Sequence, residues 1–400
     1  MLETKKLRRL AVPAAMVALA LALAGCSAGG TTAGGGGESD PLVKVDGSTL
    51  IPSGTYETSQ SGDKPTDYLE LKLTPELAEK AKAKKFKVGI VMHTMQLDWS
   101  QLQVRGITDT LESYDAEIVG VADPKWDVEK QLAMIDNMIQ LKPDAIIASP
   151  TDTAATAAGF KKIQEAGIKL IFMNQQVDGL KYGENFVTVV ANEAVKDGMA
   201  AAAMLDPYIP KDGTIACVCF GVAFYNVDQR EKGFADYFAK ERPDVTLKTV
   251  EFTDENKTGQ IAGDFLTANP DVKGLFAPWD APGMLVIAAQ REQGKNIPMT
   301  MMDLGAEDAI ALAKGTNVKG VMAQAPYDHG VGEAWATMRA LLGEKVGPFY
   351  TTPGYAALPN NVLDAWKFIW HQDPPKDLIT ACKSNKVCAE GEKNAQYLKG

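Results

Sequence analysis

Ten polar or aromatic residues stand at or shortly after the ends of short apolar runs in the middle of this chain. Flat aromatic rings cover the C–H faces of a sugar, and charged or amide groups make paired hydrogen bonds to neighbouring hydroxyls. The residue types therefore predict a site for a sugar or polyol, with no catalytic residue, cofactor or metal. The ten residues are His93, Trp99, Ser149, Asn174, Gln175, Arg230, Trp279, Asp280, Asp303 and Gln324.

Each of these residues also has a purely structural interpretation. Ser149 and Asp280 could cap the helices that follow them, and for Asp280 we favour the cap. His93 and the two tryptophans could belong to the core, although loops after strands are an unusual place to bury two tryptophans. Arg230 is the most informative, because it opens a predicted helix, where a cation is disfavoured unless a partner or ligand holds it.

The apolar runs form two successive series of β–α units. The first series contains FKVGIVMH, AEIVGVAD, DAIIASP, KLIFMN and VTVVA, and the second contains TIACVCF, TLKTVEF, GLFAPW, PMTMMD and VKGVMAQ. Continuous apolar runs fit parallel strands that helices cover on both faces. They predict an α/β fold with two doubly wound, Rossmann-like lobes. Ligands in such sheets bind beyond the carboxyl ends of the strands, where the ten residues stand.

The beginning of the chain reads as an export signal. Four cations stand against one acid in the first ten residues, and an apolar run from Ala11 to Ala24 follows, too short to be a permanent membrane helix. The run ends Leu-Ala-Gly-Cys at Cys26, which looks like a bacterial lipobox. We expect a signal peptide over residues 1–25, a lipid on Cys26 and an extracytoplasmic, membrane-anchored protein. An ordinary signal peptide with a chance cysteine is the alternative.

The segment that follows is expected to be a tether and a lead-in, residues 26–85. Ser27 to Asp40 reads SAGGTTAGGGGESD, which has almost no apolar side chain to bury. Residues 41–74 have no clear period. A short helix is predicted from Pro75 to Lys85, with Thr74 as its N-cap and proline at its first position.

Composition sets limits on the body. The 400 residues of the whole chain exceed the usual size of one domain, which favours two lobes in the body. The formal charge of −10 becomes more negative when the cationic signal peptide is removed. Such an acidic body argues against nucleic-acid binding and against electrostatic adhesion to anionic lipid.

The other four cysteines fall into two pairs. Cys382 and Cys388 lie in a polar tail, ACKSNKVCAE, and export permits a disulfide between them. Cys217 and Cys219 lie in the predicted strand TIACVCF with their side chains on one face. We interpret them as small core residues, because metal binding would need a second pair of ligands.

Several blocks of the body together resemble the type I periplasmic binding proteins that are similar to the ribose-binding protein. The resemblance spans about residues 86–352 and implies two lobes joined by a three-crossing hinge that closes over a sugar. The blocks are FKVGIVMHTMQLDW, IIASPTDTAATAAGFKKIQEAGIKLIFMN, QREKGF, FLTANPDVKGLFAPWDAPGMLVIAAQ, MMDLG and VKGVMAQAPYDHG.

The resemblance implies a role for each of the ten residues. In the first lobe His93 and Trp99 line the sugar, and Ser149 stands where asparagine is usual. Asn174 and Gln175 replace an Asp-Arg pair of the family, and Leu97 replaces a polar residue.

In the second lobe the family's Arg230, Asp303 and Gln324 are kept, and Trp279 stands where asparagine is common, before the family's Asp280. A pocket with two fewer charges and an added tryptophan points to a short polyol or a modified sugar.

The resemblance also sets the expected lobes and partners. Lobe one is expected at residues 86–191 with 325–351, and lobe two at 192–324 with 352–400, where the C-terminal tail packs against a lobe. We expect a monomer that delivers its solute to the permease of an ABC importer.

Two other functions are weighed. An enzyme is disfavoured, because the sequence has no G-x-S-x-G, P-loop or H-E-x-x-H motif and only three histidines. The sequence does not exclude a sensory receptor of the same fold, because import and sensing both use lobe closure. A transcription repressor of related fold is excluded, since a signal peptide stands in place of DNA-binding helices.

Overall fold

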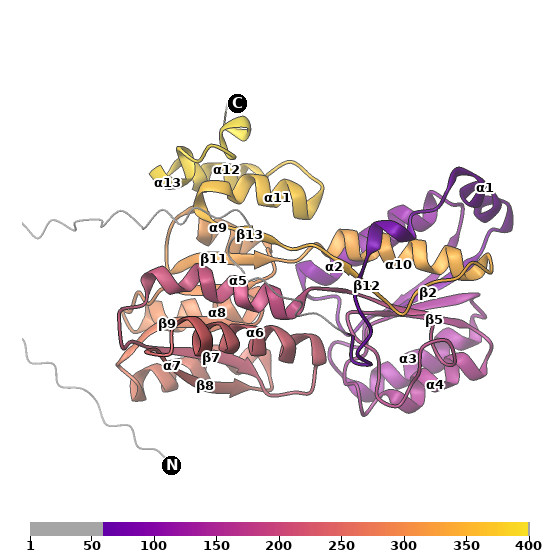
Figure 1. The fold of residues 1–400 in the computed structure, drawn as a ribbon, viewed down its shortest axis with the longest axis horizontal. Coiled ribbons are helices and arrows are strands. Elements are labelled where there is room, and N and C mark those ends of the chain that lie inside the picture. The colour runs from indigo at the N-terminus through magenta and orange to yellow at the C-terminus, as the bar shows by residue number, and fades with distance from the viewer. Residues whose placement is uncertain (1–58, 399–400) are drawn as a thin grey trace, which may run out of the picture. The chain divides into compact units, whose positions relative to one another are not determined.

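The computed structural model describes residues 59–398, which form two β-sheets with helices around each (Figure 1). The predicted signal peptide, Cys26 and the glycine-rich tether lie outside these residues. Within residues 59–398, every helix is too short or too polar to cross a membrane.

The first sheet has seven strands, and all of its neighbouring strands are parallel. In spatial order they are β1 (Thr66–Asp67), β12 (Phe349–Thr352), β6 (Thr188–Asn192), β5 (Lys169–Met173), β4 (Ala145–Ala148), β2 (Lys87–Val91) and β3 (Glu117–Ala122). Five of them, β2 to β6, coincide with the first predicted series of apolar runs.

Helices cover both faces of this sheet, because its strands are apolar on both sides. Their bounds are α1 (Pro75–Lys84), α2 (Asp98–Glu112), α3 (Val128–Gln140), α4 (Ala157–Glu165) and α10 (Pro326–Leu341). Ile90 packs into one core with α1, α2 and α10, whereas the next residue, Val91, packs into another with α3 and α4. Figure 1 shows α2 and α10 on one side of the sheet, and α3 and α4 on the other.

The second sheet has six strands and one antiparallel edge. Its order is β13 (Tyr355–Ala357), β11 (Val318–Ala323), β10 (Met299–Met302), β9 (Val272–Ala277), β7 (Thr214–Phe220) and β8 (Thr246–Phe252). The helices around it are α5 (Ala194–Leu205), α6 (Tyr225–Glu241), α7 (Thr258–Ala268), α8 (Asp280–Glu292) and α9 (Ala306–Ala313). Strands β7 to β11 coincide with the second predicted series, so the predicted fold class is confirmed.

The described chain passes between the two sheets three times: after β6, after β11 and after β12. Parallel strands place their carboxyl ends at one edge of each sheet. The loops that follow those ends, in both lobes, carry the residues singled out from the sequence.

Residues 59–85 form part of the first lobe. Strand β1 pairs with β12, and α1 begins at Pro75, where the Thr74 hydroxyl accepts a hydrogen bond from the amide of Leu77. The two-residue β1 and the short 3₁₀ helix after it were not predicted from the sequence. The 3₁₀ helices are η1 (Tyr68–Leu71), η2 (Asp206–Tyr208), η3 (Glu255–Lys257), η4 (Pro359–Asn361) and η5 (Ala395–Tyr397).

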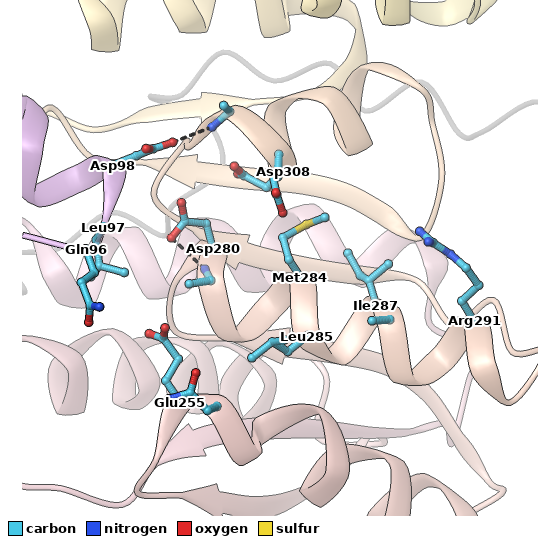
Figure 2. Close-up of a pocket in the computed structure, with 15 residues that line it drawn as sticks. Gln96, Leu97, Asp98, Glu255, Asp280, Met284, Leu285, Ile287, Arg291 and Asp308 are labelled. Atoms are coloured by element: carbon cyan, nitrogen blue, oxygen red, sulfur yellow. Dashed lines mark hydrogen bonds between the residues drawn. The ribbon is translucent and has the colours of Figure 1, made fainter.

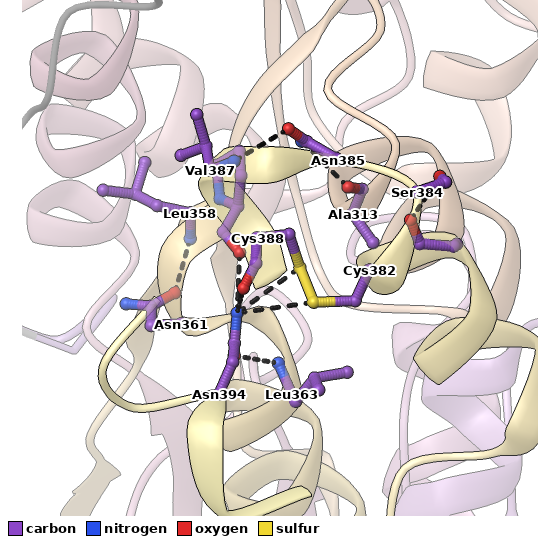
Figure 3. Close-up of a disulfide and its surroundings, with 12 residues drawn as sticks. Ala313, Leu358, Asn361, Leu363, Cys382, Ser384, Asn385, Val387, Cys388 and Asn394 are labelled. Atoms are coloured by element: carbon purple, nitrogen blue, oxygen red, sulfur yellow. Dashed lines mark hydrogen bonds between the residues drawn. A yellow bond between two sulfur atoms is a disulfide. The ribbon is translucent and has the colours of Figure 1, made fainter. Parts of the chain in front are cut away.

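The C-terminal tail packs on the second lobe. Its helices α11 (Val362–Trp370), α12 (Lys376–Lys383) and α13 (Lys386–Ala389) place apolar residues in the same core as α7, α8 and α9. Cys382 and Cys388 are buried there and bonded to each other, and the Asn394 amide donates a hydrogen bond to the Cys388 carbonyl beside them (Figure 3).

The pair Cys217 and Cys219 differs from the interpretation as separate core residues. Both side chains are buried on one face of β7, as predicted, but their sulfur atoms are joined in a disulfide. Residues two apart in a strand project to the same face, which brings the two sulfurs within reach of each other.

Candidate ligand-binding site

A small cavity of about 30 Å³ lies where the carboxyl ends of strands from the two sheets meet. Six of the ten sequence-predicted residues line it, together with four others. The lining residues are His93, Leu97, Trp99, Trp126, Asn174, Phe224, Val227, Arg230, Trp279 and Asp303. Residues that are far apart in the sequence and belong to both lobes thus share one cavity.

Half of the residues that line this cavity carry aromatic rings. Trp126 makes an edge contact with His93, with ring centroids 4.5 Å apart, and stacks on Trp279 at 6.4 Å. Trp99 and Phe224 lie 6.0 Å and 5.7 Å from the His93 ring. These rings offer apolar faces of the kind that cover the C–H groups of a carbohydrate.

Three residues around the cavity have left-handed backbone conformations. Asn174, Asp303 and Trp126 have φ angles of 60°, 67° and 65°. Asn and Asp tolerate this region, whereas a bulky residue such as tryptophan rarely adopts it. The backbone amide of Trp126 donates a hydrogen bond to the His93 carbonyl, which holds the strained loop against β2. Strain of this kind concentrates at functional sites.

His93 is a neutral, polar group in this aromatic wall. It is buried, and its Nδ1 atom has no hydrogen-bond partner. Burial lowers the pKa of His93 to about 3, so the ring is uncharged at neutral pH. A neutral imidazole both accepts and donates one hydrogen bond, which suits a hydroxyl group of a ligand.

Arg230 and Asp303 supply the charges of the cavity. The Nη1 atom of Arg230 lies 3.8 Å from Oδ2 of Asp303, and both side chains are buried. Burial raises the pKa of Asp303, while the Arg230 charge lowers it. Neither Nε of Arg230 nor Oδ1 of Asp303 has a hydrogen-bond partner, so donor and acceptor capacity is left for a ligand.

A buried row of amides holds the guanidinium group in place. Arg230 donates to the Asn226 side chain at 2.9 Å and to the Pro278 carbonyl. Asn226 donates to Asn192 at 2.7 Å, and Asn192 donates to Asp197 at 2.6 Å. This row links helix α6 to the end of β6, where the chain first crosses between the sheets.

The position of Arg230 in its helix differs from the sequence interpretation. Helix α6 begins at Tyr225, so Arg230 lies in its second turn and not at its N-terminus. The side chain is therefore held by Asn226 and Asp303, and the argument from a cation at a helix start does not apply to it.

Gln175 and Gln324, two of the predicted contact residues, support the cavity from behind its wall. Gln324 accepts a hydrogen bond from Nε1 of Trp99 at 3.0 Å, and Gln175 accepts one from the backbone amide of Asn226 at 3.1 Å. Both glutamines are buried, and neither lines the cavity. Their carbonyl groups are used within the protein, whereas Nε2 of each has no hydrogen-bond partner, so their role as direct ligand contacts stays a prediction.

Ser149 and Asp280 also lie outside the cavity wall. Ser149 is buried directly after the end of β4, and its carbonyl accepts a hydrogen bond from Gln131. Asp280 is the first residue of α8, accepts a hydrogen bond from the Ala281 amide, and lines a separate pocket. The N-cap of α8 is Trp279, so Asp280 is not the cap that we favoured, and its role as a ligand contact stays a prediction.

Sequence reasoning missed Trp126, Phe224 and Val227. Trp126 follows the run AEIVGVAD, and Phe224 follows TIACVCF. Both residues obey the rule that sites form after strand ends, so that rule, applied to every loop, could have found them. Val227 lies inside α6, where its apolar type gives no signal of a site.

A larger pocket of about 420 Å³, which we call the outer pocket, adjoins the cavity described above, which we call the central cavity. Trp126 and Trp279 line both spaces, so the stacked pair stands between them. The outer pocket is lined by polar residues from both lobes, among them Thr151, Asp152 and Glu255. Glu255 accepts a hydrogen bond from Nε1 of Trp279 at 2.9 Å. The outer pocket therefore has the position of an entrance to the cavity.

One group of side chains within residues 59–398 has the spacing of metal ligands: Cys217, Cys219 and Glu231. The two cysteines are bonded to each other, and a metal ion needs them as thiolates. None of the three residues lines the central cavity.

The chain is similar to a group of known binding proteins. The sequence model of the periplasmic binding protein domain matches residues 88–345. The ribose import binding protein RbsB of Bacillus subtilis is 24% identical over 270 residues, which are 68% of this chain and 86% of that protein. A putative rhizopine-binding protein of Rhizobium meliloti is 23% identical over 64% of this chain and 83% of its own length.

Solved structures share the fold. A solute-binding protein of an ABC transporter from Agrobacterium vitis, bound with α-D-tagatopyranose, has a TM-score of 0.67 and 23% identity, over 72% of this chain and all of that one. A solute-binding protein from Mycobacterium smegmatis with bound glycerol has a TM-score of 0.63 and 20% identity, over 69% of this chain and 95% of that one.

Proposed function

Because this chain belongs to the family of periplasmic binding protein domains, we propose that it captures a small sugar or polyol between its two lobes and delivers it to an ABC permease. The protein is a solute-binding protein of the kind that serves sugar ABC transporters, and not an enzyme. It acts outside the cytoplasm.

One observation carries the choice of ligand and site. Aromatic rings from both lobes share a single cavity with a buried ion pair from the second lobe. The first lobe supplies His93, Trp99, Trp126 and Asn174, and the second supplies Arg230, Trp279 and Asp303. A solute that contacts both groups at once stabilises the closed arrangement of the lobes over the open one.

The free volume favours a small solute. A cavity of about 30 Å³ holds little more than ordered water. A sugar would need Trp126 and Trp279 to move apart, whereas a polyol of a few carbons needs a smaller shift. The structural relatives whose descriptions name a ligand include proteins bound to glycerol and to monosaccharides, which supports this size range.

The proposed anchor rests on the sequence alone. The lipobox at Leu23 to Cys26 and the glycine-rich run after it fit a lipid-bound N-terminus with a tether. A Cys26→Ala variant should move from the membrane fraction to the soluble fraction when it is expressed in a bacterium that processes lipoproteins. A variant that stays in the membrane fraction like the parent chain would refute this anchor.

The ligand class is tested by a thermal-shift screen of the full-length protein. The panel contains pentoses, hexoses, inositols and polyols of three to six carbons. A ligand at about a hundred times its dissociation constant should add about 2.7 kcal/mol to the free energy of unfolding. A hit among these solutes supports the proposal and names the ligand, and a blank across the whole panel would overturn it.

A further inference from the structure

A large acidic pocket lies beside the central cavity. Its volume is about 580 Å³, and both lobes line it. Gln96, Leu97 and Asp98 come from the first lobe, and Glu255, Asp280 and Asp308 come from the second (Figure 2). Leu97 lines both this pocket and the central cavity, so the two spaces are neighbours.

Three carboxylates converge on Gly305 at the start of α9. An oxygen of each of Asp98, Asp280 and Asp308 lies within 3.3 Å of the position that a Cβ atom on Gly305 would take. Oδ2 of Asp98 also accepts a hydrogen bond from the amide of Ala306 at 3.0 Å. The three acids belong to three helices, α2, α8 and α9, of which α2 is in the first lobe.

Asp308 distinguishes this cluster from ordinary acids at helix starts. Its side chain is fully buried, and neither carboxylate oxygen has a hydrogen-bond partner. Burial and the nearby Asp280 raise the pKa of Asp308 well above its ordinary value. Such a buried carboxyl group stays neutral unless a positive group lies beside it, so a bound cation would stabilise its ionised form.

The protein itself does not supply that positive group. Among residues 59–398, no lysine, arginine or histidine forms an ion pair with Asp98, Asp280 or Asp308. Arg291 lines the same pocket at the opposite end from Asp98 and is separated from it by Met284 and Ile287 (Figure 2). The positive Arg291 therefore lies at one end of the pocket, and the acids lie at the other end, at the boundary between the lobes.

The spacing of the acids decides between a metal ion and an organic cation. Carboxylate oxygens must lie about 2.0–2.6 Å from a bound Mg²⁺ or Ca²⁺, which requires them to be close together. In the part of the chain that the structure describes, the only set of side chains with metal spacing is the one around Cys217, and these acids do not form such a set. An ammonium nitrogen accepts longer contacts of about 2.7–2.9 Å and fits more widely spaced oxygens.

We infer that this pocket binds the ammonium group of a cationic solute, so that the transported ligands include an amino sugar or amino polyol. The inference rests on the proposed function, since the same solute would place its hydroxyl groups in the adjoining central cavity. An ammonium group held between Asp98 of one lobe and Asp280 and Asp308 of the other joins the lobes in the closed form. The apolar side chains of Met284, Leu285 and Ile287 suit its carbon skeleton.

The test compares solutes that differ only in one amine. Calorimetric titration of the full-length protein measures the dissociation constants of serinol against glycerol, and of glucosamine and galactosamine against the parent sugars. In at least one pair the amine should bind about tenfold more tightly, as one charge-assisted hydrogen bond provides. Amines that bind no better than their neutral partners in every pair would overturn the inference.

Variants locate the preference in the pocket. The preference for the amine is the dissociation constant of the neutral solute divided by that of its amine. Asp308→Asn and Asp98→Asn should each reduce this ratio by about tenfold. Asp264→Asn removes the same charge from an exposed site on α7 and should leave the ratio unchanged. If Asp308→Asn and Asp98→Asn had the same ratio as Asp264→Asn, the inference would be overturned. Displacement of a bound amine by CaCl₂ would also overturn it, because it would identify a metal site.

The outcome also separates this inference from the proposed function. Neutral sugars that bind without any preference for amines would leave the proposed function standing and remove the inference. An amine that binds in a pocket-dependent way, with no binding of any neutral sugar or polyol, would support the inference and restrict the proposed function to amino sugars and amino polyols. Binding of no solute in either class would remove both.

Discussion

Trp126 and Trp279 stack across the boundary between the two lobes, with ring centroids 6.4 Å apart and ring planes 26° from parallel. Trp126 comes from the loop between β3 and α3, and Trp279 is the N-cap of α8. Both rings line the central cavity and the outer pocket. The pair therefore has to part before a solute passes from the outer pocket into the cavity.

Trp126→Ala should weaken ligand binding by about tenfold, because one aromatic face is lost from the site. Calorimetry with the ligand from the thermal-shift screen measures the change. Trp126→Phe should retain part of the affinity, since it keeps a ring. Trp335→Phe is the matched control, because Trp335 stacks on Tyr68 away from the cavity. Equal affinity in Trp126→Ala and the parent chain would exclude Trp126 from the site.

Arg230→Gln should both abolish measurable binding and destabilise the fold. The change leaves Asp303 buried without its cation, which costs about 3 kcal/mol of unfolding free energy. Chemical denaturation measures the loss. The double variant Arg230→Gln with Asp303→Asn should regain much of the stability without regaining binding. A double variant that recovered ligand affinity would show that the ion pair acts only in folding.

Acid should destabilise the protein through His329, which lies in α10 and is fully buried. Burial lowers the pKa of His329 to about 3, so between pH 6.5 and 3 the unfolded chain binds a proton that the folded chain does not. The free energy of unfolding should therefore fall as the pH falls through this range. Between pH 7 and 5 the loss from this residue is about 2 kcal/mol.

His329→Gln isolates that effect. Denaturation at pH 7 and pH 5 should show a loss that is about 2 kcal/mol smaller in His329→Gln than in the parent chain. Other groups that titrate in this range, such as His93, act in both proteins and cancel in the comparison. Parallel losses in the two proteins would mean that His329 is not kept neutral in the folded state.

Removal of the tail disulfide should lower stability without changing ligand binding. Cys382 and Cys388 close a short loop in the core of the second lobe, away from the cavity (Figure 3). A loop of this size contributes about 2 kcal/mol by restricting the unfolded chain. The double change of both cysteines to alanine should reduce the free energy of unfolding by this amount. An unchanged denaturation midpoint would mean that the crosslink is absent or without effect.

The fold was predictable because the inner strands of both sheets are buried on both faces. Such strands read as continuous apolar runs, and TIACVCF coincides with β7 over its whole length. TLKTVEF coincides with β8, an edge strand of which only Phe252 is fully buried. Strand β1, at Thr66–Asp67, was not predictable, because two residues carry no periodicity. It exists only through its pairing with β12, which lies far along the chain.

The sequence predicted which strand ends carry the site, but it did not predict where each side chain points. His93, Arg230 and Asp303 were found because they follow or lie near strand ends, and they do line the cavity. Asp280 follows the same kind of strand but is the first residue of a helix, which directs it into the acidic pocket. Gln324 points to Trp99, a contact between distant parts of the sequence that no local pattern encodes.

The central claim, that a sugar or polyol binds between the lobes, is tested most directly by tryptophan fluorescence during titration with the ligand from the screen. Three of the six tryptophans, Trp99, Trp126 and Trp279, line the cavity. We expect a saturable change in emission that gives the calorimetric dissociation constant and that becomes smaller when Trp126 and Trp279 are both changed to phenylalanine, since Trp99 remains in the cavity. A ligand that binds by calorimetry but leaves the emission of the parent chain unchanged would place the site elsewhere and contradict the account.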